Sequence, residues 1–361
     1  MLYFLSGFRD SFSFLNIFRY ITFRSGAAAF TSFFLCLILA PIFIRKFQKD
    51  EVKEGVDRDY CQALSEVQKY KQSTPTMGGI FIVLSILSAL FLWADLSNLY
   101  VLLSILTMST LAVLGFIDDY LKICQKGHRG LSGGTKLFWQ FVLGCVVGFF
   151  VFLAPDTTTR LDIPFLKSTI LYLDIFFILW AALIVMSCSN AVNLTDGLDG
   201  LAIGCVLFVA LGLGALSYIS GNFKFAEYLF LPFIPGTGEL TVVCAAILGA
   251  SLGFLWFNCY PASIFMGDVG SLALGGTLGA IAVFIKKEIL LILLGGIFVW
   301  EALSVILQVL SVKTRGKRIF KMSPFHHHLQ LLGWNESKII VRFWIIAIIL
   351  ALLTLTTIKI R

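Results

Sequence analysis

The sequence predicts an all-α integral membrane protein with about ten transmembrane helices. Of its 361 residues, 58% are hydrophobic and 14% are charged, whereas a soluble domain is typically about 45–50% apolar and about 25% charged. This apolar excess is too large for one buried core and fits a chain whose outer surface faces lipid. Because no long stretch has a soluble composition, we expect a single membrane domain over residues 1–361, with any active site built from helix ends and short loops.

Ten apolar segments are long enough to cross about 30 Å of hydrocarbon, which takes about 20 helical residues. They lie at approximately residues 21–44, 77–94, 99–117, 135–153, 170–188, 201–219, 239–257, 268–285, 289–311 and 339–358. Residues 1–20 mix apolar with charged side chains and predict an amphipathic interfacial segment, so the ten helices occupy residues 21–358. The first apolar run has no small-residue cleavage pattern, so no cleavable signal peptide is expected.

The distribution of basic residues predicts which loops face the cytoplasm. One set of loops holds 17 Lys and Arg residues, while the alternate set, which includes both termini, holds nine. The richer set is 45–76, 118–134 (counted to Lys136), 189–200, 258–267 and 312–338. The positive-inside rule places this set in the cytoplasm and both termini in the periplasm. The net charge of +7 fits either contact with anionic lipid or attraction of an anionic substrate.

Two other kinds of site are not expected. The eight cysteines include no C-x-x-C pair, and most lie in apolar runs, which indicates packing rather than disulfide or metal roles. No basic stretch is interleaved with aromatic residues in the way that nucleic-acid sites require, so no nucleic-acid partner is expected.

Five polar clusters stand out, and all five fall in the predicted cytoplasmic loops. They are Lys71 with residues 74–79, Asp118 and Asp119 followed by Lys122, residues 190–200, residues 258–271, and residues 323–328. Each also has a structural interpretation as a cap, a turn, a charge pair or a solvated loop. Their common location favours one functional site, in which Lys71 and Lys122 would contact phosphate.

The two carboxylates of the second cluster would destabilise the helix that carries them, so a structural role does not explain them. Asp118 and Asp119 end the third apolar segment, where adjacent acids oppose the helix dipole and each other. Helical neighbours point about 100° apart, so symmetric chelation of one ion is not expected. Instead, one carboxylate would contact a metal or a polar substrate while the other acts as a base.

The third and fourth clusters add further acids and amides. Asn190, Asn193, Asp196 and Asp199 recur every third residue and would form one polar stripe if that stretch were helical. Asp199 and Asp268 could each be a helix N-cap instead. Glycines around Asp268 leave room for an anionic ligand at a helix N-terminus, and Phe265 either stacks on a base or anchors at the interface.

The fifth cluster and the carboxylates together indicate a reaction class. His326, His327 and His328 lack the i, i+4 spacing of a zinc site, so proton transfer or phosphate binding is expected. Carboxylates with few metal-binding thiols indicate Mg²⁺. Carboxylates, Lys, His and a hard ion at a membrane face predict phosphoryl transfer to or from a lipid.

Five motifs in order resemble the phospho-N-acetylmuramoyl-pentapeptide-transferases, a branch of the polyprenyl-phosphate N-acetylhexosamine-1-phosphate transferases. They are Pro-Thr-Met-Gly-Gly, Asp-Asp-Tyr, Asn-x-x-Asn-x-x-Asp-Gly-x-Asp-Gly-Leu, the 258–271 stretch and Pro-x-His-His-His. The likeness covers essentially the whole chain. It implies an inner-membrane enzyme that makes lipid I and UMP from UDP-MurNAc-pentapeptide and undecaprenyl phosphate, using Mg²⁺, in peptidoglycan synthesis for cell shape and division.

The resemblance also implies residue roles and a homodimer. Asp268 would be the Mg²⁺ ligand, Asp118 the base acting on the lipid phosphate, and Asp119 a support for the same centre, with His326 also catalytic. The residues implied in substrate binding are Lys71, Thr76, Lys122, Asn193, Asp196, Asp199, Asn258, Phe265 and His327. Direct attack by the lipid phosphate and a phospho-aspartate intermediate both stay open.

Several alternatives and departures accompany this hypothesis. A UDP-GlcNAc-dependent enzyme of the same superfamily is the nearer alternative. A secondary transporter is the farther one, although transporter sites lie near the midplane rather than at one face. Ser73 and Gln330 stand where the family often has Gly and an acidic residue. Asp174 and Glu301 are intramembrane acids to which no catalytic role is assigned.

Overall fold

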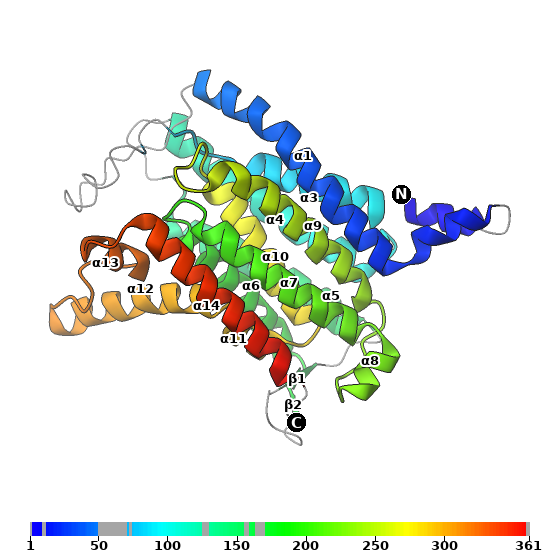
Figure 1. The fold of residues 1–361 in the computed structure, drawn as a ribbon. Coiled ribbons are helices and arrows are strands. Elements are labelled where there is room, and N and C mark those ends of the chain that lie inside the picture. Colours follow the sequence, from blue (N-terminus) through cyan, green and yellow to red (C-terminus); the bar gives the residue numbers. More distant parts are fainter. Residues whose placement is uncertain are drawn as a thin grey trace.

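The computed structural model describes residues 2–8, 12–49, 71, 74–124, 130–154, 159–162 and 170–358, and these are almost entirely helical (Figure 1). The elements are η1 (Leu2–Phe8), η2 (Ser13–Arg19), α1 (Ile21–Lys49), α3 (Gly79–Trp93), α4 (Leu99–Cys124), α5 (Gly133–Leu153), β1 (Arg160–Asp162), β2 (Ile170–Tyr172), α6 (Phe176–Thr195), α7 (Leu201–Ser220), α8 (Phe223–Tyr228), η4 (Thr237–Glu239), α9 (Leu240–Asn258), α10 (Gly267–Phe284), α11 (Glu288–Leu294), α12 (Gly296–Arg315), α13 (Phe325–Leu331) and α14 (Glu336–Thr357). The predicted all-α class is confirmed.

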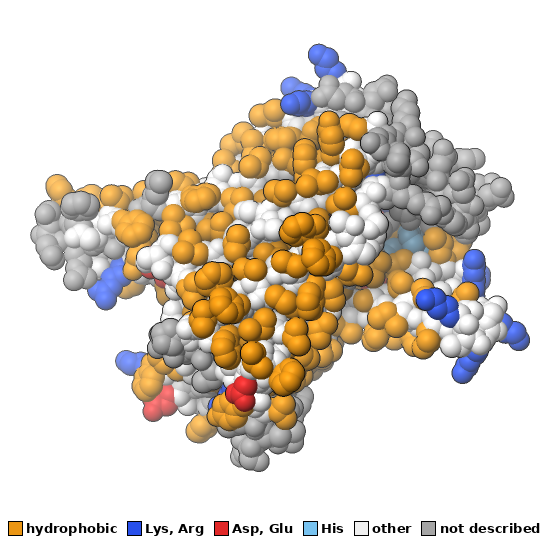
Figure 2. Space-filling model, turned by 180° about the vertical axis from the view of Figure 1, so that it is seen from behind, with side chains coloured by type: hydrophobic (Ala, Val, Ile, Leu, Met, Phe, Trp, Pro, Cys, Tyr) orange, Lys and Arg blue, Asp and Glu red, His pale blue; other side chains and the backbone are white. Residues whose placement is uncertain are grey.

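The predicted membrane segments have helical counterparts. Nine helices among the described residues are long and apolar enough to cross a membrane, and α3 is a shorter apolar helix of 15 residues. Hydrophobic side chains cover much of the surface seen in Figure 2. A soluble bundle would instead place polar residues on that outer face. The chain is therefore an integral membrane protein.

Three predicted segments have clearly wrong boundaries. The third was expected to end at residue 117, but α4 runs to Cys124, so Asp118 and Asp119 lie in a helix rather than in a loop. The ninth is not one helix, because α11 ends at Leu294 and α12 begins at Gly296. Successive glycines lower helix propensity at that break. The fifth was expected at residues 170–188, but Ile170–Tyr172 pairs antiparallel with Arg160–Asp162, and α6 runs from Phe176 to Thr195. The predicted 189–200 loop is therefore helical over its first half.

The core is built around α10. Every residue of α10 from 269 to 284 is buried, and the helix packs against α3, α4, α6 and α7. A Cβ on Gly115 of α4 would lie 2.3 Å from the Asp268 carbonyl oxygen, and one on Gly79 of α3 would lie 2.1 Å from the Gly270 nitrogen. Small residues allow membrane helices to approach this closely. The backbones of α4 and α10 thus meet where both helices carry carboxylates.

Buried ion pairs fasten the end of the bundle opposite to those carboxylates. The Arg24 side chain is 1% exposed and donates to both carboxylate oxygens of Glu239, at 2.6 and 2.5 Å. Lys287 likewise pairs with Asp162 of the hairpin. Charges removed from water are tolerated when they are paired in this way.

Candidate functional site

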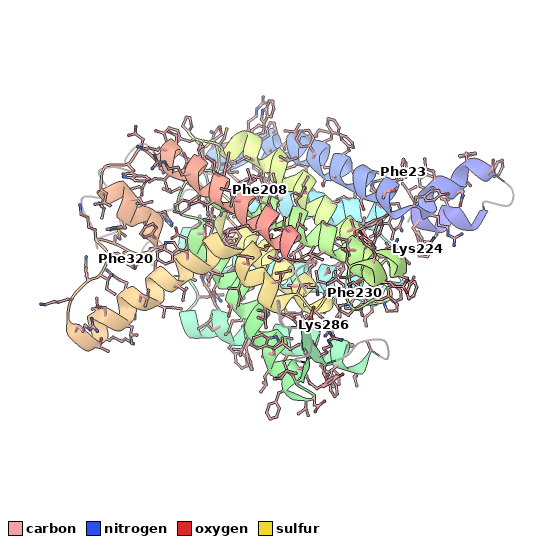
Figure 3. All side chains as sticks on the ribbon, turned by 60° about the horizontal axis from the view of Figure 1, so that its bottom comes forward. Phe23, Phe208, Lys224, Phe230, Lys286 and Phe320 are labelled. Atoms are coloured by element: carbon pink, nitrogen blue, oxygen red, sulfur yellow. The ribbon has the colours of Figure 1, made fainter. Side chains whose placement is uncertain are left out.

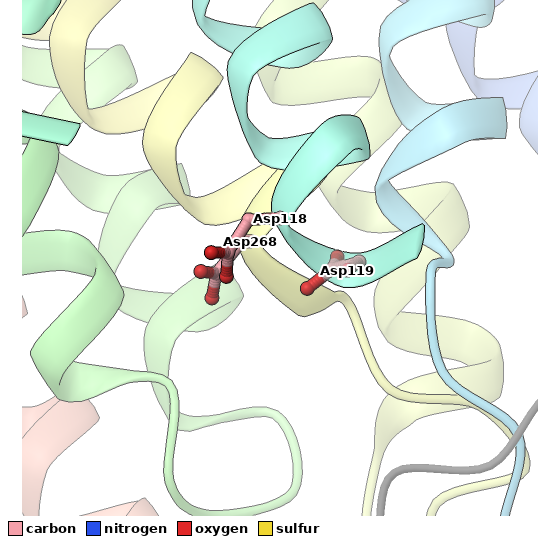
Figure 4. A group of neighbouring side chains, drawn as sticks. All are labelled: Asp118, Asp119 and Asp268. Atoms are coloured by element: carbon pink, nitrogen blue, oxygen red, sulfur yellow. The ribbon is translucent and has the colours of Figure 1, made fainter. Parts of the chain in front are cut away.

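Three carboxylates converge at one end of the bundle. Asp118 and Asp119 project from α4, and Asp268 projects from the first turn of α10 (Figure 4). One oxygen from each lies within 4.8 Å of the others, and Asp118 is fully buried. Two such charges repel by about 3 kcal/mol at an effective dielectric constant of about 20. The arrangement therefore requires compensating positive charge.

Lys122 and Lys136 supply that compensation. Lys122 Nζ lies 2.7 Å from Asp118 Oδ2, 3.2 Å from Asp268 Oδ2 and 3.6 Å from Asp119 Oδ1. Lys136 Nζ, from the first turn of α5, lies 2.7 Å from both Asp118 Oδ2 and Asp268 Oδ2. Each contact at 2.7 Å is worth about 6 kcal/mol of Coulomb attraction on the same estimate, which outweighs the repulsion. The sequence analysis identified Lys122 but missed Lys136, whose only signal was its place at a helix start.

Three neutral donors orient the carboxylates. The Leu131 N–H donates to Asp118 Oδ1 at 2.7 Å, and the Val269 N–H donates to Asp119 Oδ2 at 3.3 Å. Asn193 Nδ2 donates to Asp268 Oδ1 at 2.7 Å. The neighbouring aspartates of α4 thus accept backbone hydrogen bonds from different elements, although Lys122 contacts both of them. Asp268 is directed at this cluster and is not an N-cap.

The cluster offers three carboxylates, which are the kind of ligand that Mg²⁺ takes. Mg²⁺–oxygen bonds of 2.0–2.1 Å place opposite ligands about 4 Å apart. The separations of up to 4.8 Å are therefore within a small side-chain movement of that geometry. Asp268, Asp118 and Asp119 are the residues that could hold the ion. The lysines bind the same oxygens, so a cation and these ammonium groups would compete for Asp268 Oδ2.

A second polar group surrounds Lys71. Lys71 Nζ lies 2.6 Å from Asp199 Oδ1 and 2.6 Å from Glu336 Oε1. Glu336 Oε1 also accepts from the Asp199 N–H, and Asp199 Oδ2 accepts from the Ala262 N–H. Asp199 is therefore a linking residue rather than a cap, since Gly200 holds the N-cap position of α7. The sequence analysis missed Glu336, whose place in the first turn of α14 looks like ordinary helix-dipole compensation.

The 258–271 stretch joins the Lys71 group to the carboxylates. The Phe265 ring centroid is 5.8 Å from Lys71 Nζ, and its backbone N–H donates to Pro75 O at 2.8 Å. Asn258 accepts from the Gly200 N–H and donates to Ile264 O. Asn258 therefore shapes the loop that carries Phe265.

Thr76 lies at the carboxylate end of the same region. It is buried, and its hydroxyl would lie 3.3 Å from a Cβ on Gly267. Asp119 Oδ2 would lie 2.5 Å from that same Cβ. A side chain at position 267 would therefore meet Asp119 directly, which explains a glycine beside Asp268.

The histidines form a third group. His326 is fully buried, and its Nδ1 lies 3.1 Å from Glu301 Oε2 of α12 while its backbone N–H donates to Glu301 Oε1. A Cβ on Gly197 would lie 2.3 Å from His326 Nε2. Glu301 thus aims His326 at the 193–199 segment, which gives this intramembrane acid a positioning contact that the sequence analysis left unassigned.

The 193–199 segment connects all three groups, although not as the stripe that the sequence predicted. The helix ends at Thr195, and Asp196 is its half-buried C-cap, so the every-third-residue pattern does not continue on one face. Asn190 instead donates to Gln140 of α5 at 2.6 Å. Asn193 reaches Asp268, Gly197 lies against His326, and Asp199 binds Lys71.

Three further residues were singled out in the sequence: Gln330, Asp174 and Ser73. His327 Nδ1 lies 2.9 Å from Gln330 Oε1, so the unusual glutamine holds a histidine. Asp174 is exposed and precedes α6, with φ of 43°, and is not within a transmembrane helix. Ser73 lies outside the described residues.

An apolar cavity of about 210 Å³ adjoins the site. It lies between α6, α10, α11 and α12, with walls that include Cys188, Val192, Leu278, Phe298, Ala302 and Ile306. Val192 precedes Asn193, the ligand of Asp268, and Ala302 follows Glu301. Ile306 is 59% exposed, so the cavity reaches the lipid-facing surface of the molecule.

The fold and the family model together define the class of protein, a membrane-embedded transferase. Residues 99–286 match glycosyl transferase family 4, and residues 71–83 match the first signature of phospho-N-acetylmuramoyl-pentapeptide-transferase. The chain is 50% identical to the phospho-N-acetylmuramoyl-pentapeptide-transferase of Citrifermentans bemidjiense, over 98% of this chain and 97% of that protein. It is 52% identical to that of Thermodesulfovibrio yellowstonii, over 100% of this chain and 99% of that protein. The chain therefore belongs to the phospho-N-acetylmuramoyl-pentapeptide-transferase family.

Neutralising either principal carboxylate should remove transferase activity. Asp118→Asn and Asp268→Asn each retain size and hydrogen bonding but delete a charge at the centre of the cluster. We expect turnover to fall by about 10²–10³-fold, the loss that follows removal of one group stabilising transition-state charge. Turnover and thermal stability would be measured in detergent.

Asp174→Asn is the matched control, because Asp174 is exposed and outside the helices. Asn also tolerates its left-handed backbone. Near wild-type turnover in either cluster variant would contradict the assigned roles, as would an equal loss in the control.

Proposed function

We propose that this chain transfers phospho-MurNAc-pentapeptide from UDP-MurNAc-pentapeptide to undecaprenyl phosphate, giving lipid I and UMP. The observation that carries the proposal is the carboxylate–lysine cluster beside a cavity that opens to lipid. The acceptor needs an apolar channel for its tail and a polar site for its phosphate. The apolar cavity and the polar site are adjacent on α6: Val192 lines the cavity, and the next residue, Asn193, donates to Asp268. The names of the relatives, which are phospho-N-acetylmuramoyl-pentapeptide-transferases, support this choice of transferred group.

Mg²⁺ is the proposed cofactor, held by Asp268 with Asp118 and Asp119. When bound, the ion would neutralise charge on the phosphate oxygens. Lys122 and Lys136 would then be drawn toward the incoming phosphates, since these anions compete with the carboxylates for the ammonium groups. The lysines would therefore neutralise the carboxylates in the free enzyme and the pyrophosphate in the substrate complex.

Direct attack is the mechanism that the contacts favour. An oxygen of the lipid phosphate forms a bond to the sugar-linked phosphorus, the bond from that phosphorus to the bridging oxygen breaks, and UMP leaves with the electron pair. In the structure the Asp118 oxygens are engaged by the Leu131 N–H and two ammonium groups. When the lysines turn to the phosphates, the proposed ion would take their place on Asp118 Oδ2, so this carboxylate would be a poor nucleophile in either state. A phosphate monoester loses its second proton near pH 6, so only a minor fraction of acceptor needs Asp118 as base at neutral pH.

The Lys71 group is the proposed nucleotide site. Phe265 presents a half-buried aromatic ring near a cation, and Asp199 and Asn258 fix the surrounding loop. His326 and His327 would contact phosphate or sugar from the other side of the 193–199 segment. The excess of basic residues in the loops at this end supports a cytoplasmic active site in a bacterial inner membrane.

The reaction itself is the first test. Purified protein in detergent would be given UDP-MurNAc-pentapeptide with a labelled sugar and undecaprenyl phosphate, with and without Mg²⁺. We expect Mg²⁺-dependent labelled lipid with equimolar UMP. Lipid product from UDP-GlcNAc alone would select the other branch of the superfamily, and folded protein that uses neither donor would reject the proposal.

Filling the apolar cavity should impair the lipid acceptor alone. Ala302→Phe places a ring among the cavity walls, and we expect the KM for undecaprenyl phosphate to rise by about tenfold or more, since a hydrophobic pocket discriminates by 10–200-fold per lost group. The KM for the nucleotide donor should stay unchanged. Val113→Phe adds a ring at a lipid-facing position outside the cavity and is the control. Equal acceptor KM in both variants would place the lipid elsewhere.

A further inference from the structure

The C-terminal half of α12 and the loop after it form an arm that leaves the main bundle (Figure 1). We define the basic arm as residues 309–323. Its five cations, all exposed, are Lys313, Arg315, Lys317, Arg318 and Lys321. The sequence has no acidic residue between Glu301 and Glu336. This positive charge is therefore uncompensated along the chain, unlike that of Lys122 and Lys136.

The same arm is apolar on its helical part. Val309, Leu310 and Val312 are 47%, 55% and 44% exposed. Figure 2 shows hydrophobic side chains along the projecting part of the molecule and Lys or Arg side chains at its free end. An apolar helix that ends in cations is suited to acyl chains along its length and anionic head groups at its tip.

The loop of the arm is ordered by hydrogen bonds to side chains of α12. Gln308 Oε1 accepts from the Ile319 and Phe320 N–H groups at 3.0 and 2.9 Å, and its Nε2 donates to Phe320 O at 3.0 Å. Ser311 Oγ donates to Lys317 O at 2.9 Å. Phe320, labelled on the arm in Figure 3, packs edge-on against Phe325 at 5.7 Å. These contacts fix the cations relative to α12.

A cavity of about 380 Å³ lies between α12 and this loop. Val309, Val312 and Met322 form its apolar side, while Lys313 and Arg318 bring two cations to it. Ser323 adds a hydroxyl. The combination matches a phosphodiester with attached hydrocarbon, because Arg and Lys bind phosphate oxygens and the aliphatic walls accept the glycerol and acyl carbons.

We propose that the basic arm binds an anionic phospholipid of the adjoining leaflet, with the lipid phosphate between Lys313 and Arg318 and its acyl chains along Val309 and Val312. The assignment to the cytoplasmic leaflet rests on the proposed orientation of the enzyme. The bound lipid holds the arm at the membrane surface. It is distinct from the acceptor, because the proposed acceptor cavity is lined on α12 by residues up to Ile306 and shares no lining residue with the cavity beside Lys313 and Arg318.

The test is lipid binding, measured without reference to catalysis. Delipidated full-length protein in neutral detergent would be titrated with phosphatidylglycerol, and with phosphatidylcholine as the zwitterionic reference, by native mass spectrometry. Each cation near an anionic membrane strengthens attraction roughly fivefold. Lys313→Gln with Arg318→Gln should therefore weaken phosphatidylglycerol binding by about tenfold or more and leave phosphatidylcholine binding unchanged. Lys313→Arg with Arg318→Lys should retain binding.

Arg45→Gln with Lys46→Gln is the matched control. It removes one Arg and one Lys that are exposed near the end of α1 and belong to the same predicted membrane face. The control should keep wild-type affinity for phosphatidylglycerol. Equal losses in the two glutamine variants would mean general charge attraction and would overturn the proposal, as would no loss in the arm variant.

A donor peptide is the other anion that these cations could hold. If the arm variant binds phosphatidylglycerol like the wild type but shows a raised KM for the UDP-linked donor in phosphatidylcholine nanodiscs, the cavity serves the donor and the lipid proposal is wrong. Absence of the proposed transfer reaction would leave the lipid titration fully interpretable.

Discussion

The approach of α4 to α10 at Gly115 determines where charge accumulates in this molecule. It places Asp268 against Asp118 and Asp119 within 4.8 Å and forces Lys122 and Lys136 to share their oxygens. Such a site has a high density of both signs of charge and little water. A divalent ion or a pyrophosphate can exchange with charges already present, so binding does not require isolated ions to be desolvated anew.

The segment from Asn193 to Asp199 couples that centre to two other groups. Over seven residues it passes from the Asp268 contact, past His326, to the Lys71–Glu336 pair. Its helical start and turned end give the three contacts different directions. A nucleotide, a diphosphate and a sugar differ in the contacts they need, and a short rigid segment can present all of them to one substrate.

The sequence predicted the membrane class and the apolar segments because both rest on local signals, and it grouped in one loop set many of the polar residues that the structure brings together at one end of the bundle. Apolar runs define spans, and the acids, amides and histidines cluster in one loop set. Lys136 and Glu336 were missed as site residues because their partners are distant in sequence and each looked like ordinary helix or loop charge. Glu301 stood out as an intramembrane acid, but its partner His326 is 25 residues away, so no role was assigned to it. The stripe through Asp199 failed because α6 ends at Thr195, just before the turn-forming pair Asp196-Gly197. Membrane orientation, Mg²⁺ and a homodimer stay predictions.

The most direct test of the account is binding of a divalent ion at the carboxylate cluster. Mn²⁺, which replaces Mg²⁺ and has an electron paramagnetic resonance signal, would be titrated into the purified protein and into Asp268→Asn, without nucleotide or lipid. If the cluster is the metal centre, the wild type should bind one saturable Mn²⁺ per chain, and this binding should be lost or weakened at least about tenfold in the variant. Equal binding by both proteins would show that the ion does not depend on Asp268 and would contradict the assignment of this cluster as the metal centre.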